Sequence, residues 1–196
     1  MARRLKKWQH ARHPWRISEI APDFELIDAW ALPARGTREE FADLCEIFAT
    51  FGDAPGDGSG LAGALFALRT WLGEKLGWDR ETNALPIPGC DETSLRQRLP
   101  PDLARATDDT TSGSPFRLLY QTGDEFAAEL SNSTVHAIVH LGWVTTGDIY
   151  RGQMGIYVKP RGRFGRVYMA AIAPFRYWIV YPALLRRIGR AWKARP

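Results

Sequence analysis

The C-terminal part of the chain, from Phe164 to Lys193, restricts the fold more than any other stretch. Its apolar residues recur every three or four positions, which predicts one long helix with an apolar stripe against a core. At about 1.5 Å per residue this helix would be on the order of 45 Å long, enough to cross a whole domain. Pro174 and Pro182 each remove a backbone donor, so we expect them to bend it. The stripe consists of Phe164, Tyr168, Ala171, Phe175, Trp178, Pro182, Leu185, Ile188 and Trp192.

Two alternatives exist for this region. Residues 166–172 could form a further strand, with the helix beginning after Pro174, but the continuous stripe from Phe164 favours helix. Residues 168–185 are also apolar enough to suggest a membrane span. Arg176 and the two prolines interrupt that stretch, and the sheet described next needs an apolar cover. We therefore expect a helix that packs on a sheet.

From Phe116 onward the apolar period changes to two, which is typical of strands with one buried face. Short turn sequences separate four such runs, so a meander of antiparallel strands is the simplest topology. The expected strands are 116–121, 124–131, 134–145 and 149–159, with turns at Thr122-Gly123, Asn132-Ser133 and Thr146-Gly147-Asp148.

Strand register follows from placing apolar residues opposite one another. Pairing Leu130 with Val135 and Trp143 with Tyr150 gives one face that is almost entirely apolar, which we expect the C-terminal helix to cover. Phe116, Leu118 and Tyr120 join this face if the first turn has three residues. The other face then carries two polar rows: Arg117, Glu129, His136 and Tyr157 in one, and Gln121, Glu125, His140 and Gln153 in the other.

In this register Glu129 lies opposite His136, and Glu125 lies opposite His140. A carboxylate beside an imidazole raises the pKa of the imidazole and orients its ring, so one interpretation is acid–base chemistry. The other is an exposed sheet face stabilised by opposite charges. The two histidines are four residues apart on one strand, about 13 Å at 3.3 Å per residue, so they cannot share a metal ion unaided.

The first half of the chain predicts a strand and two helices. Residues 24–32 alternate loosely and end at Pro33. A capping box at residues 37–40 opens a helix whose apolar positions are Phe41, Leu44, Phe48 and Phe51. After a turn-rich break, a second helix contains Leu61, Leu65, Leu68, Trp71, Leu72 and Leu76. Residues 79–115 hold polar clusters and several prolines, and we expect a long surface connection there.

Charge is concentrated at the two ends of the chain. Residues 1–16 carry six Lys and Arg and residues 186–196 carry five, with no acid in either segment, so the body between them is net acidic. This argues against a nucleic-acid-binding face on the domain. We expect residues 1–20 to form a basic tail, either solvated and partly held in place by Trp8 and Trp15 or touching an anionic membrane surface, and residues 21–196 to form one domain.

The sequence lacks the motifs of several well-known classes of enzymes and cofactor-binding proteins. No nucleophile elbow, dinucleotide-binding glycine pattern, phosphate-binding loop, CxxC or HExxH motif is present. The sequence therefore predicts no cofactor and no metal, and leans away from an enzyme. Arg161-Gly162-Arg163 could bind phosphate at a helix start, although a plain turn explains it as well. Cys45 and Cys90, without a secretory leader, indicate reduced thiols and a cytoplasmic protein.

The expected order of strand, two helices, antiparallel sheet and long C-terminal helix resembles the helix-grip architecture of START-like (SRPBCC) domains. Residues 157–168, with Ala173-Pro174-Phe175-Arg176 and Ile179-Val180-Tyr181-Pro182, resemble an uncharacterised bacterial family, domain of unknown function 2867. The resemblance begins near Asp28 and is strongest after Asp124. Family members also occur behind a nicotinamide-binding domain, which implies a functional link to a nicotinamide-dependent oxidoreductase. The family supplies no catalytic residues to carry over.

Taken together, the sequence predicts an α+β helix-grip fold in which an antiparallel sheet wraps around a long C-terminal helix. We expect a small apolar or amphipathic ligand to bind between sheet and helix, with plain core packing as the alternative role of the same side chains. An enzyme using Glu129/His136 or Glu125/His140, and an interaction module using the basic ends, are the other hypotheses. The expected ligand-binding residues are Trp71, Tyr120, Trp143, Tyr150, Met154, Phe175 and Trp178.

Overall fold

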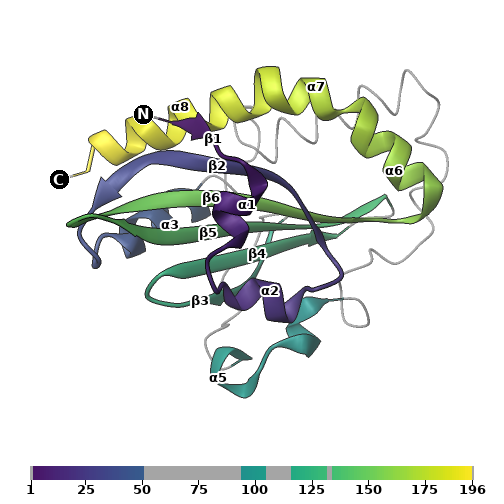
Figure 1. Ribbon diagram of the computed structural model, residues 1–196, viewed down its shortest axis with the longest axis horizontal. Coiled ribbons are helices and arrows are strands. Elements are labelled where there is room, and N and C mark those ends of the chain that lie inside the picture. Colours follow the sequence, from purple (N-terminus) through teal and green to yellow (C-terminus); the bar gives the residue numbers. More distant parts are fainter. Residues whose placement is uncertain (1, 51–93, 105–115, 132–133, 196) are drawn as a thin grey trace.

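One antiparallel sheet, covered on both faces, organises the described part of the chain (Figure 1). The computed structural model describes residues 2–50, 94–104, 116–131 and 134–195. Within them the strand order is β1-β2-β6-β5-β4-β3. The strands are β1 (Arg3–Arg4), β2 (Glu25–Gly36), β3 (Arg117–Gln121), β4 (Glu125–Ser131), β5 (Val135–Thr146) and β6 (Ile149–Pro160).

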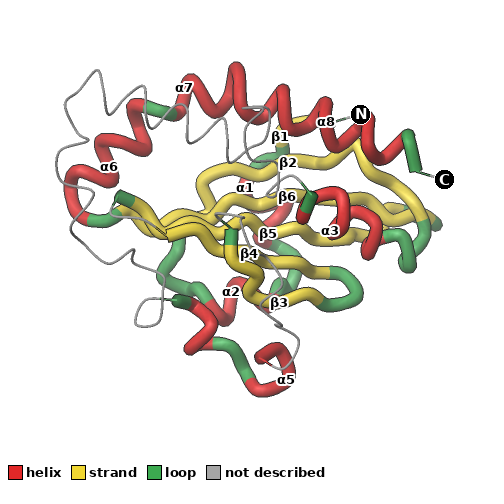
Figure 2. The backbone as a smooth tube through the Cα atoms, turned by 180° about the vertical axis from the view of Figure 1, so that it is seen from behind, coloured by secondary structure: helices red, strands yellow, loops and turns green. Residues whose placement is uncertain are grey.

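Short helices surround the sheet, and a broken helix runs along one side of it (Figures 1 and 2). The second helix expected from the sequence, with Trp71, lies outside the described residues. The described helices are α1 (Lys7–Ala11), α2 (Arg16–Ile20), α3 (Phe41–Ala49), η2 (Leu95–Arg98), α5 (Pro101–Ala104), α6 (Gly162–Ala171), α7 (Ala173–Phe175), the π-helical η3 (Arg176–Val180) and α8 (Tyr181–Lys193).

The expected meander of β3 to β6 is confirmed, and β2 adds to it by pairing with β6. The expected register is wrong by two residues, because Glu125 pairs with Gly142 and Trp143 pairs with Gly152. The β5–β6 hairpin closes through Gly147-Asp148 alone, with Gly147 at φ 68°, a conformation suited to two-residue hairpin loops. A shift of two residues leaves every side chain on its expected face.

Tyr120 is the exception. A β-bulge between Leu118 and Tyr120 places two residues of β3 against one of β4, so Tyr120 pairs with Ala127. Its side chain is therefore on the polar face rather than the apolar face, where it is fully buried. Periodicity alone could not reveal the additional residue.

The apolar face, here called the helix face, packs against α3 and α8. Glu40 accepts a hydrogen bond from the backbone N–H of Thr37, which is the carboxylate half of the expected capping box. As expected, α3 buries Phe41, Leu44 and Phe48 against the sheet. Phe51 lies outside the described residues.

The C-terminal helix bends, as its prolines predicted, because a break at Ile172 and the π-helical turn η3 interrupt it. Residues 166–171 lie in α6, so the strand alternative is wrong. Up to the start of this turn the buried positions Gly165, Ile172 and Arg176 each follow an expected stripe position by one residue, so Phe164 and Trp178 are 46% and 79% exposed. Beyond it, Leu185, Ile188 and Trp192 are buried as expected. Among the described residues, no helix is long and apolar enough to cross a bilayer.

The second face, here called the N-terminal face, is also buried, which corrects the expectation of an exposed polar face. Residues of α1, α2 and η2 cover it, on the side of the sheet opposite α3 (Figures 1 and 2). His10 and Ile17 are fully buried, and Trp15 nearly so. The N-terminal segment thus contacts the sheet through buried residues such as His10, Trp15 and Ile17, while other residues of it, including Trp8 at 57%, are exposed.

This packing depends on a glycine in β5. A Cβ atom built on Gly142 would lie 2.5 Å from Cη2 of Trp15, so the indole ring occupies the space of a side chain. We expect Gly142→Ala to lower the free energy of unfolding by about 1–3 kcal/mol through overpacking, measured by urea denaturation. Gly123→Ala is the control, because no atom lies within 4 Å of its Cβ position. Equal stability of the two variants would contradict the packing of Trp15 on β5.

Candidate functional site

The structure brings together only part of the expected ligand-binding set. Trp143, Tyr150 and Met154 gather on the helix face near the β5–β6 hairpin. The rings of Trp143 and Tyr150 stack with centroids 6.4 Å apart, and Trp143 Nε1 donates to the carbonyl of Thr37 at 2.9 Å. Trp143 and Met154 are buried under the helices, so this end of the face is a packed core.

The other expected residues are dispersed. Phe175 is half-buried against the same core, and Trp178 points to solvent. Tyr120 is on the opposite face of the sheet. Trp71 lies outside the described residues.

At the far end of the helix face the apolar side chains are less covered. Leu118, Leu130 and Ile156 pack against the core but are only half-buried. Ile156 pairs with Val139 and Leu130 with Ala137, both toward the end of the sheet away from the β5–β6 hairpin. Among the described elements, α3, η3 and α8 contribute the buried helix residues of this core, whereas Phe175 is only partly buried against it. The sequence analysis did not single out these side chains.

A buried polar cluster adjoins this apolar surface. Asp28 pairs with Ile156 across β2 and β6, and its carboxylate is fully buried. It accepts hydrogen bonds from Tyr177 and, at 2.6 Å, from Tyr181. Arg176 Nη2 lies 3.3 Å from Asp28 Oδ2. Asp28, an acidic residue within the otherwise largely apolar β2, is a sequence feature from which this cluster could have been predicted.

The electrostatics of the cluster follow from its burial. Burial, together with the charge of Asp28, raises the pKa of Tyr181, so its hydroxyl remains a donor. Arg176 is also buried, and its Nε has no hydrogen-bond partner among the described residues. The cluster thus retains a hydrogen-bond donor, Arg176 Nε, which can donate to an oxygen atom of a ligand.

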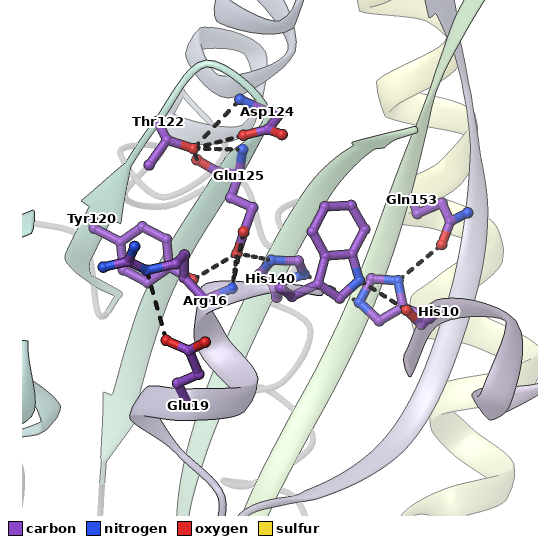
Figure 3. Close-up of polar contacts among 10 residues, drawn as sticks. His10, Arg16, Glu19, Tyr120, Thr122, Asp124, Glu125, His140 and Gln153 are labelled. Carbon is purple, nitrogen blue, oxygen red and sulfur yellow. Dashed lines mark hydrogen bonds and ion pairs between the residues drawn. The ribbon is translucent and has the colours of Figure 1, made fainter. Parts of the chain in front are cut away.

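The N-terminal face contains a second polar network, centred on Glu125 (Figure 3). Its carboxylate accepts from the Tyr120 hydroxyl at 2.9 Å, from the Arg16 backbone N–H at 2.9 and 3.0 Å, and from His140 Nε2 at 3.1 Å. Burial alone would raise the pKa of Glu125, but the hydrogen bond and charge of His140 outweigh burial and lower it.

His10 extends this network from α1 to β6. Its Nε2 lies 3.1 Å from Nδ1 of His140, and its Nδ1 lies 3.0 Å from Oε1 of Gln153 (Figure 3). With this orientation of the Gln153 amide, His10 donates from Nδ1 to Gln153, and its Nε2 faces Nδ1 of His140. Burial, and then the neighbouring His140, lower the pKa of His10 to about 3.

The second expected pair also forms. Glu129 Oε2 lies 2.8 Å from His136 Nε2 and 3.0 Å from the backbone nitrogen of Leu95, which donates to it. Ser94 donates to the other oxygen of the same carboxylate. Both pairs were expected as direct neighbours, and the register shift makes them diagonal neighbours. The roles of Ser94 and His10 were not predicted, because these residues belong to segments expected to form a surface connection and a tail.

Each of these two pairs joins a histidine and a glutamate by a hydrogen bond, but both pairs are buried. His140 is fully buried beneath Trp15 and His10, and His136 is buried beside Phe24. A substrate could reach them only if the N-terminal segment moved away. Within the described ranges, no group of three or more His, Cys, Asp and Glu side chains is arranged to hold a metal ion.

Comparison with known proteins gives one match. A family model described as "Protein of unknown function (DUF2867)" matches residues 20–183. No curated protein and no solved structure matches the chain.

Proposed function

The chain belongs to the DUF2867 family of proteins of unknown function, and from this premise we propose that it binds a small amphipathic molecule on the helix face. The apolar part of the ligand lies on Leu118, Leu130 and Ile156. Its polar group accepts a hydrogen bond from Arg176. The observation that carries this proposal is the direct pairing of half-buried Ile156 with the buried polar residue Asp28.

Apolar burial provides the affinity. The core side chains on the same face are almost fully buried, for example Val139 and Leu141, so the half-buried ones nearby still have surface to remove from water. Each 100 Å² of apolar surface covered by a ligand stabilises the complex by about 2.5 kcal/mol before the costs of association. These few partly exposed aliphatic side chains can therefore bind the apolar part of a small ligand.

The polar cluster around Asp28 and Arg176 orients the ligand through the ligand's polar group. The pairing of Arg176 with Asp28 uses Nη2 and leaves Nε available as a buried donor. Small-molecule sites commonly combine apolar lining with a few placed polar groups. The resemblance to START-like helix-grip domains, with a ligand between sheet and C-terminal helix, supports the same location.

An environment-sensitive anilinonaphthalene sulfonate dye tests the proposal, because it joins apolar rings to an anionic acceptor. We expect the folded protein to bind the dye and increase its fluorescence. Ile156→Trp fills the apolar surface and should weaken binding by about tenfold or more, since a loss of about 1.4 kcal/mol already gives that factor.

The matched control is Ile149→Trp, which introduces the same side chain at an exposed position of the β5–β6 hairpin. Its dye affinity should equal that of the wild type. Circular dichroism and thermal unfolding confirm that each variant is folded before titration. Equal binding by Ile156→Trp and Ile149→Trp, or no binding by the folded wild type, would refute this site.

A further inference from the structure

We infer that the outer surface of the C-terminal helix, from α6 to α8, binds the surface of an anionic lipid bilayer. This inference stands apart from the proposed ligand site, because it depends on the solvent side of the helix. The broken helix follows one border of the molecule in both views, so the sheet adjoins it on one side only (Figures 1 and 2).

The solvent side of this helix carries several exposed large apolar side chains between Phe164 and Ile179. Trp178 is 79% exposed, Val167 64%, Ile179 49% and Phe164 46%. The buried residues Ile172, Arg176 and Val180 recur every four positions and define the inward side. Trp178 and Ile179 lie between the buried residues Arg176 and Val180 and are exposed, so they face away from the sheet. Large apolar side chains on one side of a surface helix are typical of an interaction site.

Charge identifies the partner. Residues 149–196 contain eleven Lys and Arg and no Asp or Glu. Arg163 and Arg166 are exposed in α6, and Arg186, Arg190 and Lys193 are exposed in α8. Exposed apolar side chains flanked by cations, with a tryptophan among them, match a helix that lies in the headgroup region of an anionic bilayer.

A protein partner is less well matched to this surface. Arginine and tryptophan are also enriched at protein interfaces, but an acidic protein partner would have to place its acids at positions that match the separated cations of α6 and α8. A bilayer with anionic lipids supplies negative charge at any spacing and an apolar layer beneath it. No shape complementarity is needed, which suits a helix interrupted by a π-helical turn.

Vesicle co-sedimentation tests the inference directly. We expect the full chain to bind vesicles of phosphatidylcholine mixed with phosphatidylglycerol, and to bind much more weakly to phosphatidylcholine alone or at high salt. Trp178→Ala should weaken binding by about tenfold. The double variant Arg186→Ser/Arg190→Ser should weaken it by about thirtyfold, because each cation near the surface contributes about five- to sixfold.

Trp8→Ala is the matched control, since Trp8 is also an exposed tryptophan, at 57%, but belongs to α1 on the N-terminal face. Its affinity for vesicles should not change. Binding that Trp178→Ala leaves intact, or no binding to the mixed vesicles at low salt, would overturn the inference. If Trp178→Ala instead converts an oligomer into a monomer in light scattering, the surface is an interface between copies of the chain and the inference is wrong.

Discussion

Asp28→Ala is expected to lower the free energy of unfolding by about 3–5 kcal/mol, measured by urea denaturation. The carboxylate is fully buried and joins β2 to the C-terminal helix through Tyr177, Tyr181 and Arg176. Without it, the buried guanidinium of Arg176 has no counter-charge and two hydroxyls lose their acceptor. Removal of one partner of a buried ion pair leaves an uncompensated charge, which is among the most destabilising single changes.

Asp23→Ala is the matched control. Asp23 also contacts two cations, Arg98 and Lys159, both at 2.6 Å, but its side chain is 36% exposed. Solvent screens these pairs, so the loss should be about 0–1 kcal/mol. The pKa of Asp23 is lowered by the same contacts, chiefly by Arg98, without changing this expectation. If the two variants lose equal stability, the docking role of Asp28 is wrong.

The second large effect is a loss of stability in acid. The folded protein keeps His10 neutral, with its pKa lowered to about 3, whereas the unfolded imidazole takes up a proton near its usual value of about 6.5. The unfolded state therefore binds more protons below pH 6.5, and stability falls as the pH falls. From pH 7 to pH 4.5 we expect a loss of about 2–3 kcal/mol, measured by urea denaturation at each pH.

Below pH 4.5 other groups add to this loss. The pKa values of Glu125 and Glu129 are lowered in the folded protein, so the stability they contribute is present above about pH 4.5 and disappears as they are protonated. The interval between pH 7 and pH 4.5 therefore isolates the histidine contribution.

His10→Gln identifies the responsible histidine. Glutamine can still hydrogen-bond to Gln153 and His140 but does not titrate, so most of the slope between pH 7 and pH 4.5 should disappear. His13→Gln is the control, because His13 is only half-buried. Burial and then Arg12 lower its pKa. An unchanged slope in His10→Gln would show that the proton uptake occurs elsewhere.

The arrangement of the sheet could be predicted from the sequence because side-chain period and turn chemistry are local properties. The strands from Arg117 to Pro160, the helix beginning at Phe41 and the bend near Pro174 follow from such patterns. The register was wrong by two residues, since shifts of two preserve both faces and the apolar pattern cannot distinguish them.

The candidate sites were harder to predict, because each depends on contacts between distant segments. His10 lies 130 residues from His140, and Asp28 lies 153 residues from Tyr181. The bulge at Tyr120 and the π-helical turn at Arg176 each insert one residue into a regular pattern, and the bulge moved Tyr120 away from the other expected ligand-binding residues. Periodicity cannot locate such insertions.

Native mass spectrometry of freshly purified protein tests the central claim most directly. If the helix face binds a small amphipathic molecule, the wild type and Ile149→Trp should carry a discrete additional mass that denaturing extraction releases. Ile156→Trp should carry it at much lower occupancy. A wild-type protein that has only its own mass, and that takes up no amphipathic probe when folded, would contradict the account.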